Sequence, residues 1–157
     1  MKIWIDADAC PGPIRDIVLR ACQRLKVQVT FVANKKLLLP ESPLISFVQV
    51  ELGPDVVDAY IVESAKMNDL VVTQDIPLAA QLVPVGISVI SPRGDHYTPA
   101  NISEHLSWRD LMTELRDSGS VGGGPKPFDD KVKRAFANHF DSELNRLLRL
   151  EQRNANG

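Results

Sequence analysis

The chain has 157 residues, of which 44% are hydrophobic and 24% charged, and its formal net charge is −2 at pH 7. These values fit one soluble domain with a sizeable core, and they exclude binding of nucleic acid through an overall basic charge, so such binding would need a local patch. No apolar run approaches the roughly 18 residues that span a bilayer, and no signal-peptide core precedes the first acidic residue, so we expect a cytoplasmic protein without membrane contact.

The first hundred residues alternate short apolar runs with helix-like patterns. Strands are predicted at 2–5, 27–32, 46–50, 70–73 and 87–90. Helices are predicted at 13–25, 55–67 and 76–82. Strands separated by helix-length segments indicate βαβ units with right-handed crossovers. The sequence therefore predicts an α/β fold around a central, mainly parallel five-stranded sheet.

The rest of the chain is predicted to be mainly helical. A turn-rich loop at 91–99 precedes a helix at 101–118, and a loop rich in glycine and proline follows at 118–128. The helix predicted at 129–150 has apolar residues at helical spacing, which indicate docking on the core or on another subunit as a homo-oligomer. We expect one domain over 1–150, with 151–157 as a flexible tail.

Aspartates follow the strands at one edge of the predicted sheet. Asp6 and Asp8 follow the first strand, Asp75 follows the fourth, and Asp55 and Asp58 begin the helix after the third. Ligands of open parallel sheets bind at this carboxyl edge, so we expect these side chains to converge. Gathered carboxylates repel one another, and Mg²⁺ or Mn²⁺ relieves that repulsion. The sequence therefore predicts a metal site with Asp6, Asp8, Asp58 and Asp75 as ligands.

Each aspartate also has a structural interpretation. Asp55 is most simply an N-cap, and Asp58 favours the helix dipole. Asp75 can cap the helix after it or form a turn, and Asp8 can cap the first helix. Asp6 is the hardest to explain in this way because it directly ends an apolar strand.

Basic residues near the same edge are candidates for contacts with phosphate. Lys35 and Lys36 follow the second strand, and Arg93 follows the fifth in a Pro-Arg-Gly turn. Solvated loop charge is the alternative for the two lysines. A further basic group is either a solvated helix face or a guide for a nucleic-acid strand, and it consists of Lys126, Lys131, Lys133 and Arg134. No catalytic role is assigned to the histidines, which show no metal-binding spacing: His96, His105 and His139.

Six segments, in order, resemble the YaiI/YqxD family of uncharacterised bacterial proteins. They are KIWIDADACP, VTFVAN, DVVDAYIVESA, LVVTQDIPLAA, SPRGDHYT, and GGGPKPF followed by AFANHFD. The resemblance extends from about residue 1 to residue 147. The family name implies no established activity.

The family in turn is similar to the PIN-like superfamily, which includes metal-dependent nucleases of RNA and structured DNA. PIN domains have an acidic residue at the end of strand 1, one on a middle helix, and one in a T-x-D turn after strand 4. These positions match Asp6, Asp58 (or Asp55), and Thr73 with Asp75. The resemblance implies a three-layer PIN-like domain with additional C-terminal helices, although fold analogy alone does not give function.

Three functions are compatible with these residues. The first is a Mg²⁺- or Mn²⁺-dependent nuclease of RNA or DNA with Asp6, Asp58 and Asp75 as catalytic residues. The second is a haloacid-dehalogenase-like phosphatase, in which Asp6 would be the nucleophile and Asp8 the general acid/base; the late acidic pair of such enzymes is missing. The third is an inactive PIN-like module that binds nucleic acid or protein.

Overall fold

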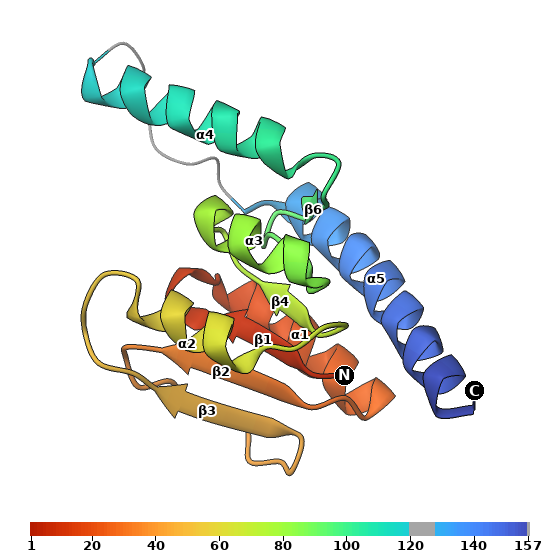
Figure 1. Cartoon of the computed structure of the whole chain (residues 1–157). Helices are drawn as coiled ribbons and strands as arrows, with labels where there is room; N and C mark the ends of the chain where they lie inside the picture. Colours follow the sequence, from red (N-terminus) through yellow and green to blue (C-terminus); the bar gives the residue numbers. More distant parts are fainter. Residues whose placement is uncertain (120–127, 157) are drawn as a thin grey trace.

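The computed structural model describes residues 1–119 and 128–156. Its centre is a six-stranded sheet in the order β3-β2-β1-β4-β5-β6, in which β1 to β5 are parallel and β6 is antiparallel to β5 (Figure 1). The strands are β1 (Ile3–Asp6), β2 (Val29–Ala33), β3 (Ile45–Gln49), β4 (Leu70–Val72), β5 (Ser88–Ile90) and β6 (His96–Tyr97). The prediction of five strands was therefore one short: β6 lies in a predicted loop, and two residues are too few to show alternation.

Over the described parts of the chain, five α-helices and two short 3₁₀ helices connect and follow the strands. The α-helices are α1 (Gly12–Leu25), α2 (Val56–Ser64), α3 (Ile76–Leu82), α4 (Ile102–Asp117) and α5 (Asp130–Asn156), and the 3₁₀ helices are η1 (Ala7–Ala9) and η2 (Val83–Val85). Helix α5 continues past its predicted end at residue 150 to Asn156, and the flexibility of 151–157 stays a prediction. The amino group of Met1 lies 2.7 Å from Glu151 Oε1 and ties this last part of α5 to the start of the chain.

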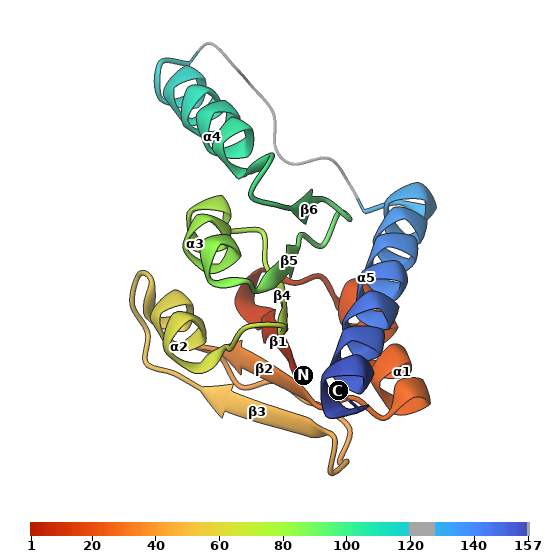
Figure 2. The same cartoon turned by 45° about the vertical axis from the view of Figure 1, so that its right-hand side comes forward.

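Side-chain alternation along β1 divides the core between the two faces of the sheet. Ile3 and Ile5 belong to a cluster with α1 and α5, whereas Trp4 belongs to one with α2 and α3. Figure 2 shows these two pairs of helices on opposite faces of the sheet. By the same alternation, Asp6 faces α2 and α3. This layered arrangement sets the direction in which the end of β1 presents its carboxylate.

Helix α5 docks on the core with the apolar face that its sequence pattern predicted. Four of its side chains are buried against the sheet and α1: Phe136, Phe140, Leu144 and Leu147. The buried Glu143 accepts hydrogen bonds from Ser88 on β5 and from Arg146. The homo-oligomer through the C-terminal helices stays a prediction.

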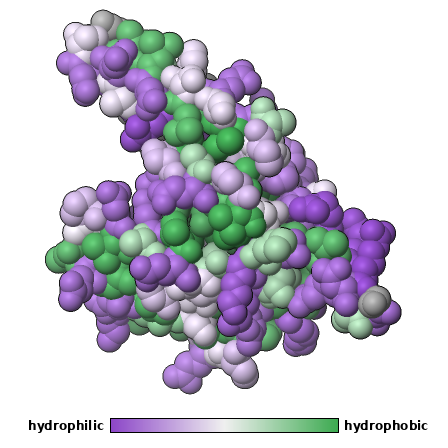
Figure 3. All heavy atoms as spheres, viewed as in Figure 1, coloured by the Kyte–Doolittle hydropathy of each residue, from purple (hydrophilic) through white to green (hydrophobic). Residues whose placement is uncertain are grey.

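Helix α4 projects beyond the rest of the molecule and contacts it mainly through α3 (Figure 1). Ile102, at its start, is the one buried residue of the helix and joins the α2–α3 cluster. Trp108 is 63% exposed and Leu111 is 44% exposed, and Figure 3 shows apolar side chains at the surface of this projecting part. Within the described residues, no helix is both long and apolar enough to cross a bilayer.

Candidate metal centre

The ends of β1 and β4 lie side by side at the carboxyl edge of the sheet. Asp6, which is 7% exposed, ends β1, and Thr73 directly follows β4. Thr73 Oγ1 donates a hydrogen bond to Asp6 Oδ2 at 2.8 Å and accepts one from the backbone N–H of Asp75 at 3.0 Å. One hydroxyl group therefore fixes the Asp6 carboxylate relative to the turn that carries Asp75.

Asp75 caps α3, as its structural interpretation predicted. Its Oδ1 accepts a hydrogen bond from the backbone N–H of Leu78 at 3.0 Å, and Pro77 lies in the first turn of the helix. Proline suits this position because the first N–H groups of a helix have no partner within it. The cap fixes the Asp75 carboxylate at the edge of the sheet.

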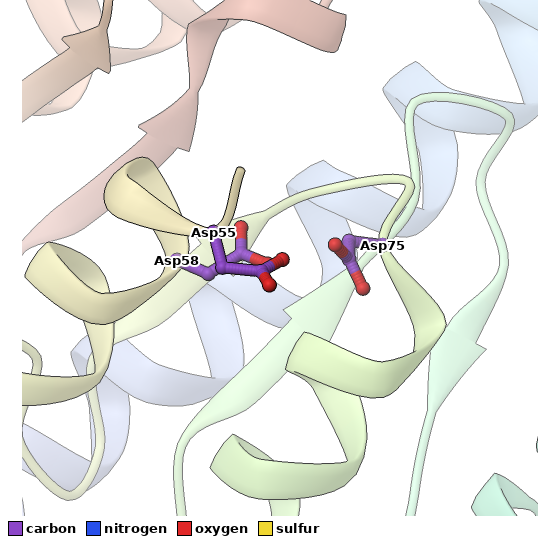
Figure 4. A group of neighbouring side chains, drawn as sticks. All are labelled: Asp55, Asp58 and Asp75. Atoms are coloured by element: carbon purple, nitrogen blue, oxygen red, sulfur yellow. The ribbon is translucent and has the colours of Figure 1, made fainter. Parts of the chain in front are cut away.

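Asp55 and Asp58 bring two more carboxylates to Asp75 from the start of α2 (Figure 4). One carboxylate oxygen from each of the three residues lies within 4.8 Å of the other two. Asp55 holds the N-cap position in the left-handed conformation (φ 63°), yet its side chain makes no capping hydrogen bond. The N-cap interpretation of this side chain was therefore wrong, and Asp55 joins a cluster for which the sequence analysis had favoured Asp58.

Proximity and burial raise the pKa values of these acids. The pKa of Asp58 rises from 3.8 to about 7, first through burial, then through a hydrogen bond with Asp75 and the charges of Asp75, Asp6 and Asp55. Burial likewise raises the pKa of Asp6, although the hydrogen bond from Thr73 opposes that rise. A cation among these oxygens would offset both the repulsion and the loss of hydration.

A cavity of about 450 Å³ opens over the three carboxylates. Its wall also includes Arg109, which comes from α4. Arg109 could not be singled out from the sequence, because nothing in its local pattern shows that α4 lies against α3. The other residues that line the cavity are Ala59, Val62, Glu63, Pro77 and Gln81.

Comparison with known proteins identifies the family. The model of the family described as "Uncharacterized BCR, YaiI/YqxD family" matches residues 4–146. The chain belongs to the YaiI/YqxD family. It is 54% identical to a UPF0178 protein of Myxococcus xanthus and 47% identical to one of Syntrophobacter fumaroxidans, each over 96% of this chain and 99% of the relative. It is also 54% identical to a UPF0178 protein of Psychromonas ingrahamii, over 92% of this chain and 95% of that one. No solved structure matches the chain.

In this YaiI/YqxD protein, Asp6 and Asp8 differ in how they lie relative to the cluster of Asp55, Asp58 and Asp75. Asp6 lies close enough to raise the pKa of Asp58, but it is not one of the three residues whose oxygens gather within 4.8 Å. Asp8 is exposed in η1, and its Oδ2 accepts a hydrogen bond from the backbone N–H of Asn34 at 2.9 Å. The interpretation of Asp8 as a cap of α1 was wrong, because Pro11 holds that position and no side chain caps it. Metal ligation by Asp6 and Asp8 stays a prediction.

The predicted phosphate contacts of this family member do not line the cavity over the three carboxylates. Lys35 and Lys36 are exposed just beyond β2. The guanidinium carbon of Arg93 lies 4.4 Å from the centre of the Phe128 ring. Of the further basic group, Lys126 lies outside the described residues, while Lys131, Lys133 and Arg134 are in the first turns of α5.

A second cavity, of about 420 Å³, is lined by the three histidines of this YaiI/YqxD protein, His96, His105 and His139, whose spacing in the sequence indicated no metal site. Its floor includes Glu143, whose Oε1 lies 3.8 Å from His96 Nε2. His139 Nδ1 donates a hydrogen bond to the carbonyl oxygen of Gly94 at 2.6 Å. Among the described residues, the cluster of Asp55, Asp58 and Asp75 is the only group of three or more acidic, histidine or cysteine side chains whose ligand atoms lie close enough together to hold one ion.

Proposed function

We propose that this YaiI/YqxD protein is a PIN-like nuclease that hydrolyses phosphodiester bonds of RNA or DNA with Mg²⁺ or Mn²⁺. The observation that carries this proposal is the convergence of oxygens from Asp55, Asp58 and Asp75 within 4.8 Å, at the carboxyl edge of a mainly parallel sheet and under an open cavity. This is the edge where open α/β sheets bind their ligands.

The donor set fits a hard divalent cation. All three groups are carboxylates, and Mg²⁺ and Mn²⁺ prefer oxygen ligands, whereas zinc sites usually contain nitrogen or sulfur. The raised pKa of Asp58 supports the same conclusion, because one of these carboxylates retains a proton near neutral pH unless a cation replaces it. When bound, such a cation lowers the pKa of a water ligand and stabilises the leaving oxygen of a phosphodiester.

Each aspartate at this edge of the sheet has a role in the proposed reaction. Asp58 and Asp75 would bind the cation, and Asp55 would complete the ligand set. Asp6 is nearly buried and is held by Thr73, so it suits a fixed acceptor that orients a water molecule or a second ligand. Asp8 is exposed, and its charge acts on Asp6.

The test combines a binding measurement with a cleavage assay. In isothermal titration, wild-type protein should bind Mn²⁺, and Asp58→Asn and Asp75→Asn should lose most of this binding. Glu63→Gln is the matched control, since Glu63 lines the same cavity outside the three-aspartate cluster. The two Asn variants should also lose cleavage of RNA or flap DNA in Mn²⁺.

Three outcomes would contradict this proposal, and two of them would favour another function. Mn²⁺ binding that survives in both Asn variants would overturn the metal centre. A phosphorylated Asp6, trapped with a phosphate ester and found by mass spectrometry, would instead indicate the haloacid-dehalogenase-like phosphatase. Nucleic-acid binding without any cleavage would indicate the inactive module.

A further inference from the structure

We infer that Arg109 is the phosphate-binding residue of the cavity over Asp55, Asp58 and Asp75. This inference rests on the proposed nuclease function and adds to it the group that binds the substrate's phosphate. It replaces none of the contacts predicted for Lys35, Lys36 and Arg93, which can bind parts of a nucleic acid outside this cavity.

The first observation is the place of Arg109 in the fold. It belongs to α4, far from the aspartates in sequence, yet it lines the cavity that they line. Among the described residues around that cavity it is the only basic one, beside the three aspartates and Glu63. A phosphodiester bound by a cation at the aspartates would therefore meet one positive side chain in the wall of the same cavity.

The second observation is that the guanidinium group is not committed to the aspartates. Arg109 forms an ion pair with its neighbour Asp110, at 3.2 Å between Nη1 and Oδ1, and the two side chains are 46% and 68% exposed. Exposed pairs of this kind contribute little to stability. Arg109 can therefore exchange this partner for a phosphate at small cost.

The chemistry of arginine suits this role. Its planar guanidinium group offers parallel N–H donors that match two phosphate oxygens, and it stays charged at all physiological pH values. Neutralisation of the phosphate charge by Arg109 would add to the neutralisation supplied by a cation held by the three aspartates. The helix that carries Arg109 is anchored at its start, where Ile102 is buried against the α2–α3 face.

A simpler role is possible for the same residue: a counter-ion that only offsets the negative charge of the cavity. The two roles differ in a measurable way. Loss of a counter-ion makes the cavity more negative, so Mn²⁺ binding should become tighter while nucleic-acid binding changes little. Loss of a phosphate ligand should leave Mn²⁺ binding equal or tighter and should weaken nucleic-acid binding.

The experiment measures both quantities on the full chain. Fluorescence anisotropy with a labelled single-stranded RNA or DNA oligonucleotide in Ca²⁺, which permits binding with little hydrolysis, gives the dissociation constant. Arg109→Gln should weaken this binding roughly ten- to a hundred-fold, the usual effect of losing a charge-assisted hydrogen-bonded contact. Arg109→Lys should keep part of the binding, because lysine retains the positive charge but cannot make the bidentate hydrogen bonds of arginine.

The matched control is Arg116→Gln, which makes the same change of charge on the same exposed helix. Arg116 is exposed, and it does not line the cavity. This variant should weaken binding less than about threefold through the general loss of charge alone. Thermal unfolding of each variant checks that the substitution leaves the protein folded.

The failure of this inference can be told apart from that of the proposed function. If wild-type protein binds Mn²⁺ and the oligonucleotide, and Arg109→Gln binds the oligonucleotide as tightly as Arg116→Gln does, the role of Arg109 is overturned while the metal centre stands. If wild-type protein binds no Mn²⁺, the proposed function fails. If the wild type binds Mn²⁺ but no oligonucleotide, the nuclease function is overturned together with the role of Arg109, while the metal centre stands.

Discussion

Thr73 connects the ends of two strands by a single hydroxyl group: its Oγ1 donates a hydrogen bond to Asp6 Oδ2 at 2.8 Å and accepts one from the backbone N–H of Asp75. The contact between Thr73 and Asp6 is buried and joins residues that are 67 positions apart. This hydrogen bond holds the Asp6 side chain, and it lowers the pKa of Asp6, which burial would otherwise raise further. The geometry of the candidate centre therefore depends on a residue that is not itself a carboxylate.

We predict that Thr73→Val, which keeps the shape and removes the hydroxyl, lowers the free energy of unfolding by about 1–3 kcal/mol because a buried carboxylate loses its donor. Mn²⁺ affinity should fall as well, since the turn that carries Asp75 loses one of its hydrogen bonds. Urea denaturation and isothermal titration measure the two effects. Thr73→Ser keeps the hydroxyl and should stay near wild type in metal affinity; a similar loss in both variants would show that the methyl group matters instead.

Much of this arrangement could be predicted from the sequence, because it follows from the direction of the strands. Parallel strands separated by helices place every strand end at one edge, so the convergence of Asp6, Asp58 and Asp75 on one region needed only the order of the elements. Alternation along β1 also settles which face Asp6 takes, because Ile3 and Ile5 occupy the other one.

What could not be predicted depends on backbone detail and on packing between distant segments. The left-handed conformation of Asp55 turns its side chain away from a capping bond, and no pattern in the sequence specifies that angle. Arg109 reaches the cavity only because α4 lies against α3, and a helix with a single buried residue gives no strong periodic signal of where it packs. The same is true of the cavity that gathers His96, His105 and His139.

Mn²⁺ affinity should rise steeply between about pH 6 and pH 8, because the pKa of Asp58 is raised to about 7 and its proton must leave before the carboxylate can bind a cation. Isothermal titration at several pH values measures this dependence, and proton release appears as a dependence of the enthalpy on the buffer. An affinity that is constant over this range would contradict a protonated carboxylate in the metal-free site.

The same raised pKa predicts the direction in which stability changes with pH. The carboxyl group of Asp58 holds its proton more tightly in the folded protein than in the unfolded chain, where its pKa is 3.8. Its contribution to stability is therefore complete below pH 3.8 and is lost as the pH rises through about 7. In the absence of metal, Asp58→Asn should show a smaller loss of stability between pH 5 and about pH 8 than wild type does, as measured by urea denaturation at each pH.

The buried Asp69 lies at the opposite edge of the sheet and offers a test that separates folding from metal binding. Its carboxylate is 6% exposed and accepts hydrogen bonds from Trp4 Nε1 at 3.0 Å and from the backbone N–H groups of Lys2 at 2.9 Å and Lys66 at 3.0 Å. The three donors come from the start of β1 and from the turn before β4, so this acid has a structural role that is complete without a ligand.

We predict that Asp69→Ala lowers the free energy of unfolding by about 2–4 kcal/mol, because it leaves buried donors without a partner. At temperatures where the variant is folded, its Mn²⁺ affinity should equal that of wild type, because Asp69 does not belong to the group formed by Asp55, Asp58 and Asp75. Asp117→Ala, which removes an exposed carboxylate, is the control and should change stability by less than about 0.5 kcal/mol. A loss of Mn²⁺ affinity in folded Asp69→Ala would mean that the two edges of the sheet are coupled, and that the aspartate cluster does not bind the ion independently of the rest of the fold.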